Sequence, residues 1–240
     1  MSGKGQVLSV LAAVLLGVFV VQAAVMASEE DLGRKVRAMR LEQQNKHEEA
    51  LQILQDIIQK HEDADIADFA RFQMAAIKHK VYRETSDQVR KRYNEIKEKD
   101  GVQAAEEDVL RTGMSAQVVA LRSDAVQKYQ EVVSATPESK YLPDAKQGKA
   151  DLYLEGEQYE AALAAYDELI AQYPKMKYAA HAQHNKGVCY FSQKKYEEAL
   201  AEFQKVLTDY ADSPYARIAK RKIVEVNKAI ADAAAQKTLP

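Results

Sequence analysis

One phrase of eight residues occurs twice in the chain and limits its possible folds more than any other feature. The first copy is Tyr159–Tyr166 and the second is Tyr196–Phe203, and the alanines at their fourth positions, Ala162 and Ala199, are 37 residues apart. A fixed period of roughly 20–50 residues is the signature of a protein built from stacked structural repeats. Each unit is expected to be two antiparallel helices whose apolar faces are covered by the neighbouring units.

Weaker copies of the phrase extend the pattern toward the N-terminus. The segment 125–137 matches 162–174 in residue type and spacing, 47–57 is another copy, and 89–101 is the weakest. We expect the alanine to lie where the two helices of a unit cross, and the aromatic residue four positions on to fill the next hole along the same face. A proline or glycine then ends the helix. The copies predict about five helix pairs.

The region before Ala125 is the least regular part of the array. Ile66–Tyr82 reads as a first helix, and Thr85 is placed to cap a second helix that ends at Gly101. The layout between Gly101 and Ser123 stays open, as one long helix or as two helices broken at Gly113.

The first helix of each unit repeats as well. Ala150 and Gly187 lie twelve residues before the alanines of their second helices, and a tyrosine follows each of them three residues on. Gly113 is expected to hold the same place before Ala125. A small residue there lets the first helix pack closely on the second. Each unit thus has a small residue, an aromatic residue, an alanine, a second aromatic residue and a proline at fixed offsets. This pattern resembles the tetratricopeptide repeat, most clearly over 141–212.

The resemblance implies an all-α fold, a right-handed superhelical solenoid over residues 28–235 followed by a flexible tail over 236–240. The last helix, from Pro214 to about Ala234, has no second helix to pair with. Its basic residues Arg217, Lys220 and Arg221 suit a capping helix that is exposed to water.

Residues 7–27 form an apolar stretch that follows Lys4. Val25, Met26 and Ala27 fit a small-residue cleavage site, which indicates a signal peptide over residues 1–27. The stretch is also 21 residues long, enough to span a bilayer core of roughly 30 Å, so a retained membrane anchor stays open. In both cases the positive charge precedes the stretch, so the repeats should face away from the cytoplasm. No cysteine directly follows it, which excludes a lipoprotein anchor.

The linkers between units share a helix stop, a polar turn and a tyrosine that opens the next helix, as in 174–178 and 211–215. This pattern with a period of 37 resembles periplasmic bacterial repeat proteins, among them the partner of the Tol–Pal system and the BamD-type lipoproteins of outer-membrane assembly. The resemblance implies a non-enzymatic periplasmic scaffold for protein–protein interactions in the cell envelope, either free after signal cleavage or anchored to the inner membrane. The alternative is a membrane-anchored accessory subunit of a membrane protein complex.

No enzyme motif occurs in the sequence, and no cofactor is expected. The formal charge of −2 shows no footprint of nucleic-acid binding. His181 and His184 are three residues apart on one helix face, but no third ligand stands at a recognisable spacing, so no metal is expected. The single cysteine, Cys189, cannot form an internal disulfide and is expected to be buried and inert.

Stacked helix pairs form a concave groove that is lined by their first helices. The repeat alignment predicts that the groove residues that contact a protein partner are Asp144, Gln147, Asp151, His181, His184, Val188 and Phe191. Phe191 is the expected anchor, provided that its ring is exposed, because aromatic side chains dominate binding energy. The two histidines are expected to be exposed, so that their protonation below about pH 6.5 would change the charge of the groove.

Overall fold

The structure is a computed structural model that describes residues 29–60, 64–175 and 177–237. Within these ranges every regular element is a helix. None of the described helices is both long enough and apolar enough to cross a membrane. The apolar stretch 7–27, expected to be a signal peptide or anchor, lies outside the described residues. The chain divides into two compact units, Met1–Ala70 and Arg71–Pro240, which are described separately.

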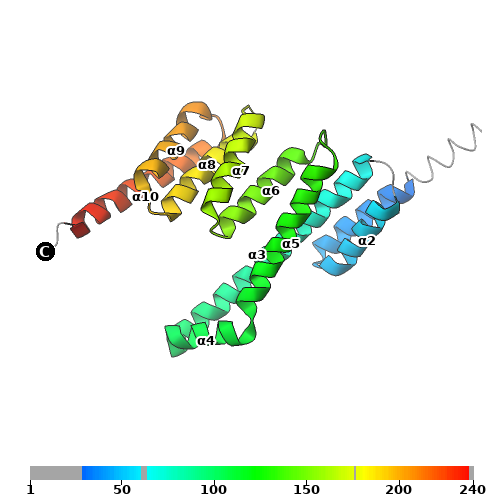
Figure 1. Ribbon diagram of the computed structural model, residues 1–240, viewed down its shortest axis with the longest axis horizontal. Coiled ribbons are helices and arrows are strands. Elements are labelled where there is room, and N and C mark those ends of the chain that lie inside the picture. Colours follow the sequence, from blue (N-terminus) through cyan, green and yellow to red (C-terminus); the bar gives the residue numbers. More distant parts are fainter. Residues whose placement is uncertain (1–28, 61–63, 176, 238–240) are drawn as a thin grey trace, which may run out of the picture. The chain divides into compact units, whose positions relative to one another are not determined.

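The first unit contains a helix pair. A helix over residues 29–43 turns through Asn45, whose φ is 58°, into α2 (His47–Lys60) (Figure 1). Lys46 closes this turn by donating its backbone N–H to the carbonyl of Leu41 over 2.9 Å. The apolar residues of α2 at helical spacing, Ala50, Leu51, Leu54 and Ile57, are buried. The helix pair predicted for this segment is therefore confirmed.

The next helix, α3 (Ala64–Asp100), is continuous over 37 residues. The break predicted near Thr85 is wrong. The reason is that no proline or glycine occurs between Ala64 and Asp100, so nothing forces the helix to end there. Thr85 instead lies in the middle of α3.

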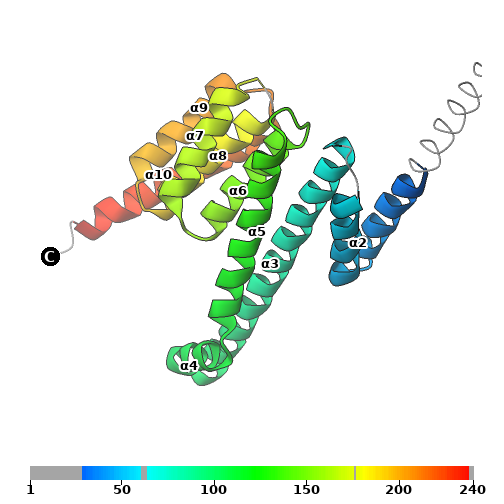
Figure 2. The same cartoon turned by 45° about the vertical axis from the view of Figure 1, so that its right-hand side comes forward.

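In the second unit, α3 turns at Gly101 (φ 91°) into the short helix α4 (Val102–Thr112), which turns at Gly113 (φ 66°) into α5 (Met114–Ala135). Gly113 therefore holds a left-handed turn and is not the small residue of a first helix, so that prediction is wrong. Figures 1 and 2 show α5 running back along α3, with α4 at the far end of both.

The true partner of the Ala125 phrase is α3. Ala75 and Tyr82 of α3 form one buried cluster with Ala125, Tyr129 and Val132 of α5. The first part of α3 and the last part of α5 are thus the two helices of one repeat, and residues 84–121 are a helical insertion within it. The described part of the chain accordingly contains four helix pairs and a final helix instead of the five pairs predicted.

An arginine fork holds α4 against α3. Arg92 of α3 donates through Nε to Oδ2 of Asp108 over 2.6 Å and through Nη2 to Oδ1 over 2.8 Å. Arg111 adds a third bond to the same carboxylate over 3.0 Å. The bond from Arg92 holds the pKa of Asp108 below its usual value. Paired charges of this geometry are the strongest kind of side-chain hydrogen bond, so they fix the tip of the insertion.

The remaining helices form a regular stack. They are α6 (Leu142–Glu155), α7 (Tyr159–Gln172), α8 (Lys177–Ser192), α9 (Tyr196–Asp209) and α10 (Pro214–Lys237), each packed against the next. Ala162 and Ala199 are fully buried, and so are the aromatic residues four positions on, Tyr166 and Phe203. The helix boundaries and the packing roles predicted from the repeated phrase are confirmed here.

Gly187 sets how closely α8 approaches α9. A Cβ atom at this position would lie 2.6 Å from Cε1 of Phe203, whose ring is fully buried and has no room to move aside. We predict that Gly187→Ala lowers the free energy of unfolding by about 1–3 kcal/mol, although alanine favours a helix by roughly 1 kcal/mol over glycine. Urea denaturation measures the change.

Gly33 provides the matched control, because it lies in the helix over residues 29–43 and a Cβ there meets nothing within 4 Å. Gly33→Ala should leave stability unchanged or raise it by up to about 1 kcal/mol. Equal effects of the two substitutions would contradict close packing at Gly187.

Candidate functional site

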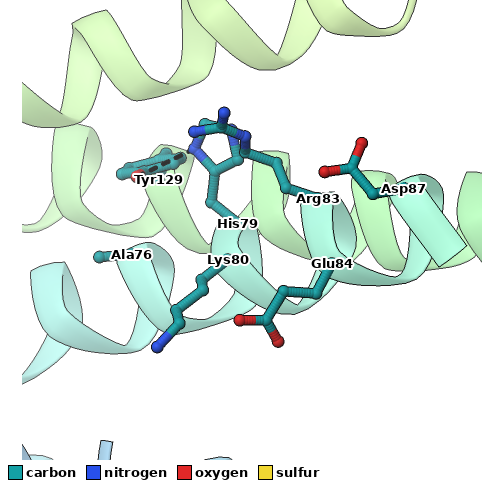
Figure 3. Close-up of a pocket in the computed structure, with 7 residues that line it drawn as sticks. All are labelled: Ala76, His79, Lys80, Arg83, Glu84, Asp87 and Tyr129. Atoms are coloured by element: carbon teal, nitrogen blue, oxygen red, sulfur yellow. Dashed lines mark hydrogen bonds between the residues drawn. The ribbon is translucent and has the colours of Figure 1, made fainter. Parts of the chain in front are cut away.

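Two adjoining hollows of about 320 Å³ each lie along α3 in the second unit. The first is lined by Ala76, His79, Lys80, Arg83, Glu84, Asp87 and Tyr129 (Figure 3), and the second by Tyr82, Arg83, Ser86, Asp87, Arg90 and Glu155. We call the two together the α3 hollow. Arg83 and Asp87 line both parts, and Tyr129 of α5 and Glu155 of α6 form the opposite wall.

Glu155 joins α6 to α3 through two basic side chains. Its Oε2 lies 3.0 Å from Nε2 of His79, and its Oε1 lies 3.6 Å from Nε of Arg83. The other ring nitrogen of His79, Nδ1, lies 3.4 Å from the hydroxyl of Tyr129. The sequence does not indicate these partners of His79, because they lie 50 and 76 residues further along the chain.

The hollow presents charges of both signs to solvent. The side chain of Arg83 is 66% exposed, and Asp87 accepts a bond of 2.6 Å from the exposed Arg90. In Figure 3, Lys80 and Glu84 point away from the side of α3 that carries His79. Burial and the nearby carboxylates of Asp151 and Glu155 raise the pKa of Tyr129, so its hydroxyl stays protonated. Such a surface suits an extended polar peptide better than an apolar small molecule.

Of the seven groove residues predicted from the sequence, Asp144, Gln147 and Asp151 lie on α6, and His181, His184, Val188 and Phe191 lie on α8. None of the seven is fully exposed. Asp144 is the most open of those for which a contact is given: its side chain is 37% exposed and its Oδ1 lies 3.9 Å from Nζ of Lys177. Their role as partner contacts stays a prediction.

The structure brings Asp151 and His181 into one polar cluster between α6, α7 and α8. The hydroxyl of Tyr166 donates to Oδ1 of Asp151 over 2.7 Å, and Nδ2 of Asn185 donates to the same oxygen over 3.1 Å. Nε2 of His181 lies 3.6 Å from that oxygen and 3.1 Å from Nδ2 of Asn185. The sequence does not indicate the polar roles of Tyr166 and Asn185, because their bonds to Asp151 join different helices.

Both histidines are more buried than predicted. His184 is 8% exposed and the side chain of His181 is 13% exposed. The ring of Tyr215, from α10, lies over both, with centroids 5.3 Å from His181 and 5.6 Å from His184. Burial lowers the pKa of each imidazole. The expectation that they are exposed and titrate near pH 6.5 is therefore wrong.

Val188 and Phe191 pack against the C-terminal core. The ring of Phe191 is half-buried, with its centroid 5.7 Å from that of Tyr196 and 5.8 Å from Nζ of Lys222. The condition for an anchor role, an exposed ring, is thus not met.

The expected burial of Cys189 is confirmed, and burial raises the pKa of its thiol to about 12. The thiol is therefore protonated at neutral pH and unreactive. In the described ranges, no three or more His, Cys, Asp or Glu side chains are grouped so that they could hold a metal ion.

The comparison with protein families matches residues 148–214 to the tetratricopeptide repeat. These residues include most of α6, all of α7, α8 and α9, and the first residue of α10. This is the region in which the repeated phrase and its packing are most regular. Repeats of this kind typically act as scaffolds for protein–protein interactions.

A solved structure shares the helical-repeat fold. It contains nearly identical TPR-like repeats from Podosopora anserina in a substituted form, and its name refers to a kinesin light chain. It aligns with a TM-score of 0.50 at 14% sequence identity, and the alignment covers 85% of this chain and 89% of that one. The form without the substitution aligns with a TM-score of 0.49 at the same sequence identity and coverage. The TPR domain of P58(IPK) aligns with a TM-score of 0.37 at 13% sequence identity, and the alignment covers 83% of this chain and 56% of that one. No curated protein sequence matches. At 14% identity, the likeness to the first of these structures extends to the helical-repeat fold alone.

Proposed function

We propose that the protein is a non-enzymatic scaffold that binds protein partners in the bacterial cell envelope. The observation that carries the proposal is the stack of tetratricopeptide repeats over residues 148–214, joined through Glu155 to the charged α3 hollow. Repeat solenoids use such extended surfaces to bind partners. A rigid array suits this role, because a pre-organised surface loses little entropy on binding.

The α3 hollow is the proposed partner site, and the groove residues predicted on α6, Asp144 and Gln147, would extend it. Arg83 and Arg90 supply positive charge, and Asp87 lies between them on the same helix. A partner segment with an acidic residue next to a basic one would match this alternation. Charge complementarity of this kind favours the right partner and raises the association rate more than it raises affinity.

The proposed setting is the periplasm, and it rests on residues 7–27 of the sequence, with a basic residue before them and acids after them. Cleavage after Ala27 would release a free periplasmic scaffold. Retention of the stretch would make the protein an anchored accessory subunit of a membrane complex, which is the alternative proposal. The intact mass of the protein and its partition between soluble and membrane fractions separate the two, because only a cleaved chain starts near Ser28.

The partner site can be tested with a photo-crosslinking amino acid placed at three positions in cells. Arg83 reports on the α3 hollow, Gln147 reports on the groove predicted from the sequence, and Gln204 is an exposed control on α9. We predict a crosslinked protein band from position 83 and none from position 204, because a partner that fills the hollow lies within reach of Arg83 alone.

A band at position 147 as well would extend the site across α6. Crosslinks at 204 in place of 83 would show that partners use the second helices, which contradicts the proposed site. Absence of any crosslinked protein at all three positions would contradict the scaffold function itself.

A further inference from the structure

The helix over residues 29–43 carries an exposed apolar stripe that nothing in the described part of the chain covers. Leu32 is 63% exposed, and Val36 and Met39 are each 47% exposed. The three residues follow the spacing i, i+4, i+7, which places them on one face of a helix. The opposite face holds Ala38, which is 1% exposed, so the helix packs into its unit by that face and turns the stripe outward.

Basic side chains flank the stripe. Residues 32–41 contain four basic residues and no acid, and the acids of the same helix, Glu29, Glu30, Asp31 and Glu42, lie toward its two ends. Two of the four are engaged within the unit, since Arg34 pairs with Glu30 and Nζ of Lys35 lies 5.1 Å from the centre of the Phe69 ring. The other two, Arg37 and Arg40, are exposed, and neither forms an ion pair with any residue that the structure describes.

We propose that this face lies on a membrane surface that carries anionic lipid headgroups. A helix with an apolar stripe and a basic margin lies in the plane of the interface, with its apolar side chains among the upper acyl chains and its cations at the headgroups. We call Leu32, Val36, Met39, Arg37 and Arg40 the docking face. In the sequence it begins five residues after the apolar stretch 7–27, so a retained stretch would hold it at the bilayer.

The chemistry of the face favours lipid over another protein surface. Two copies of this chain meeting through the docking face would bring Arg37 and Arg40 of each copy together, and this repulsion disfavours self-association. A bilayer with anionic headgroups supplies apolar depth and negative charge at once. The docking face lies on the first unit and does not involve the α3 hollow, so the proposal is independent of the partner site.

The test places an environment-sensitive NBD label on the full chain at Val36→Cys. A label at Gln52→Cys, exposed on α2 of the same unit, is the matched control. Cys189 does not compete for the label, because it is buried and the pKa of its thiol is raised to about 12. Both proteins are reconstituted with vesicles of phosphatidylcholine alone or of phosphatidylcholine with phosphatidylglycerol, and lipids carrying a doxyl quencher report on depth.

We expect the label at 36, and not the label at 52, to shift to the blue and to be quenched only when phosphatidylglycerol is present. Replacing Arg37 and Arg40 by glutamine should lower the ratio of docked to free helix by roughly thirtyfold, since each cation near an anionic surface contributes about a factor of five. The result that would overturn the proposal is a label at 36 that stays in water with both lipids. A blue shift that needs high protein concentration and no vesicles would also overturn it, in favour of contact between copies.

Discussion

Replacing Phe203 by alanine should lower the free energy of unfolding by about 3–5 kcal/mol, the range for deleting a fully buried phenylalanine ring. The ring is fully buried in the cluster that joins α9 to α10, together with Ala199, Val206 and Val226. It also lies against the backbone of α8 at Gly187, so little can collapse into the space it leaves. Urea denaturation followed by circular dichroism gives the change.

Phe191 offers a matched comparison, because it is the same residue type in the same repeat but is only half-buried. Phe191→Ala should cost about 1–2 kcal/mol, roughly in proportion to the apolar area it removes from water. If Phe191→Ala cost as much as Phe203→Ala, the assignment of Phe203 to the centre of the core would be wrong. If Phe191→Ala instead left stability unchanged but weakened partner binding, the anchor role predicted from the sequence would be restored.

The regular part of the array could be predicted from the sequence because its rules are local. In each repeat the alanine, the aromatic residue four positions on and the helix stop lie within a single helix and its end. The helical period therefore assigns them to one face without any knowledge of the rest of the chain. This is why the predicted starts at Tyr159 and Tyr196 agree with those of α7 and α9.

The insertion over residues 84–121 could not be predicted by the same rules. Val89, Tyr93 and Ile96 have the spacing of a second helix, and all three are half-buried, but they lie on the continuation of α3. An apolar face with helical spacing looks the same in a short helix and in a long one. Only a terminator distinguishes them, and α3 has none before Gly101.

The candidate site depends on contacts between helices that cannot be predicted from the spacing of residues in the sequence. His79 of α3 contacts Glu155 of α6 only because the two helices pack close to one another in the folded chain. Likewise, the period shows that His181 and His184 share a face of α8, but not that Tyr215 of the last helix covers that face. A residue's partner on another element follows from packing, so sequence spacing alone left both sites incomplete.

Lowering the pH from 7.5 to 5 should destabilise the second unit through His181 and His184. Burial lowers the pKa of both imidazoles in the folded chain, whereas in the unfolded chain they take up protons near pH 6.5. Below about pH 6.5 the unfolded state therefore binds more protons than the folded state, and stability falls as the pH falls. The slope reaches at most about 1.4 kcal/mol per pH unit for each histidine, and the loss ends once the folded chain is protonated too.

The charged groups around the pair define the limits of this window. Asp151 of α6 favours the charged form of His181, but this effect offsets only part of the lowering of the pKa by burial. Lys222 of α10 disfavours the charged form of His184. Burial also raises the pKa of Asp151 itself. Its contribution has the opposite sign, because between that raised pKa and about pH 3.9 the folded state holds a proton that the unfolded state releases.

The double variant His181→Gln, His184→Gln isolates the histidine contribution, because glutamine keeps a polar side chain at each position and does not titrate. Urea midpoints measured between pH 7.5 and 5 should fall less steeply for the variant than for the unmodified protein. A variant with the same pH slope would show that the two imidazoles do not control acid stability. Burial is the main reason why both rings resist protonation. At His181 alone, Nδ2 of Asn185 lies 3.1 Å from Nε2, and this donor favours the neutral ring because it requires that nitrogen to accept.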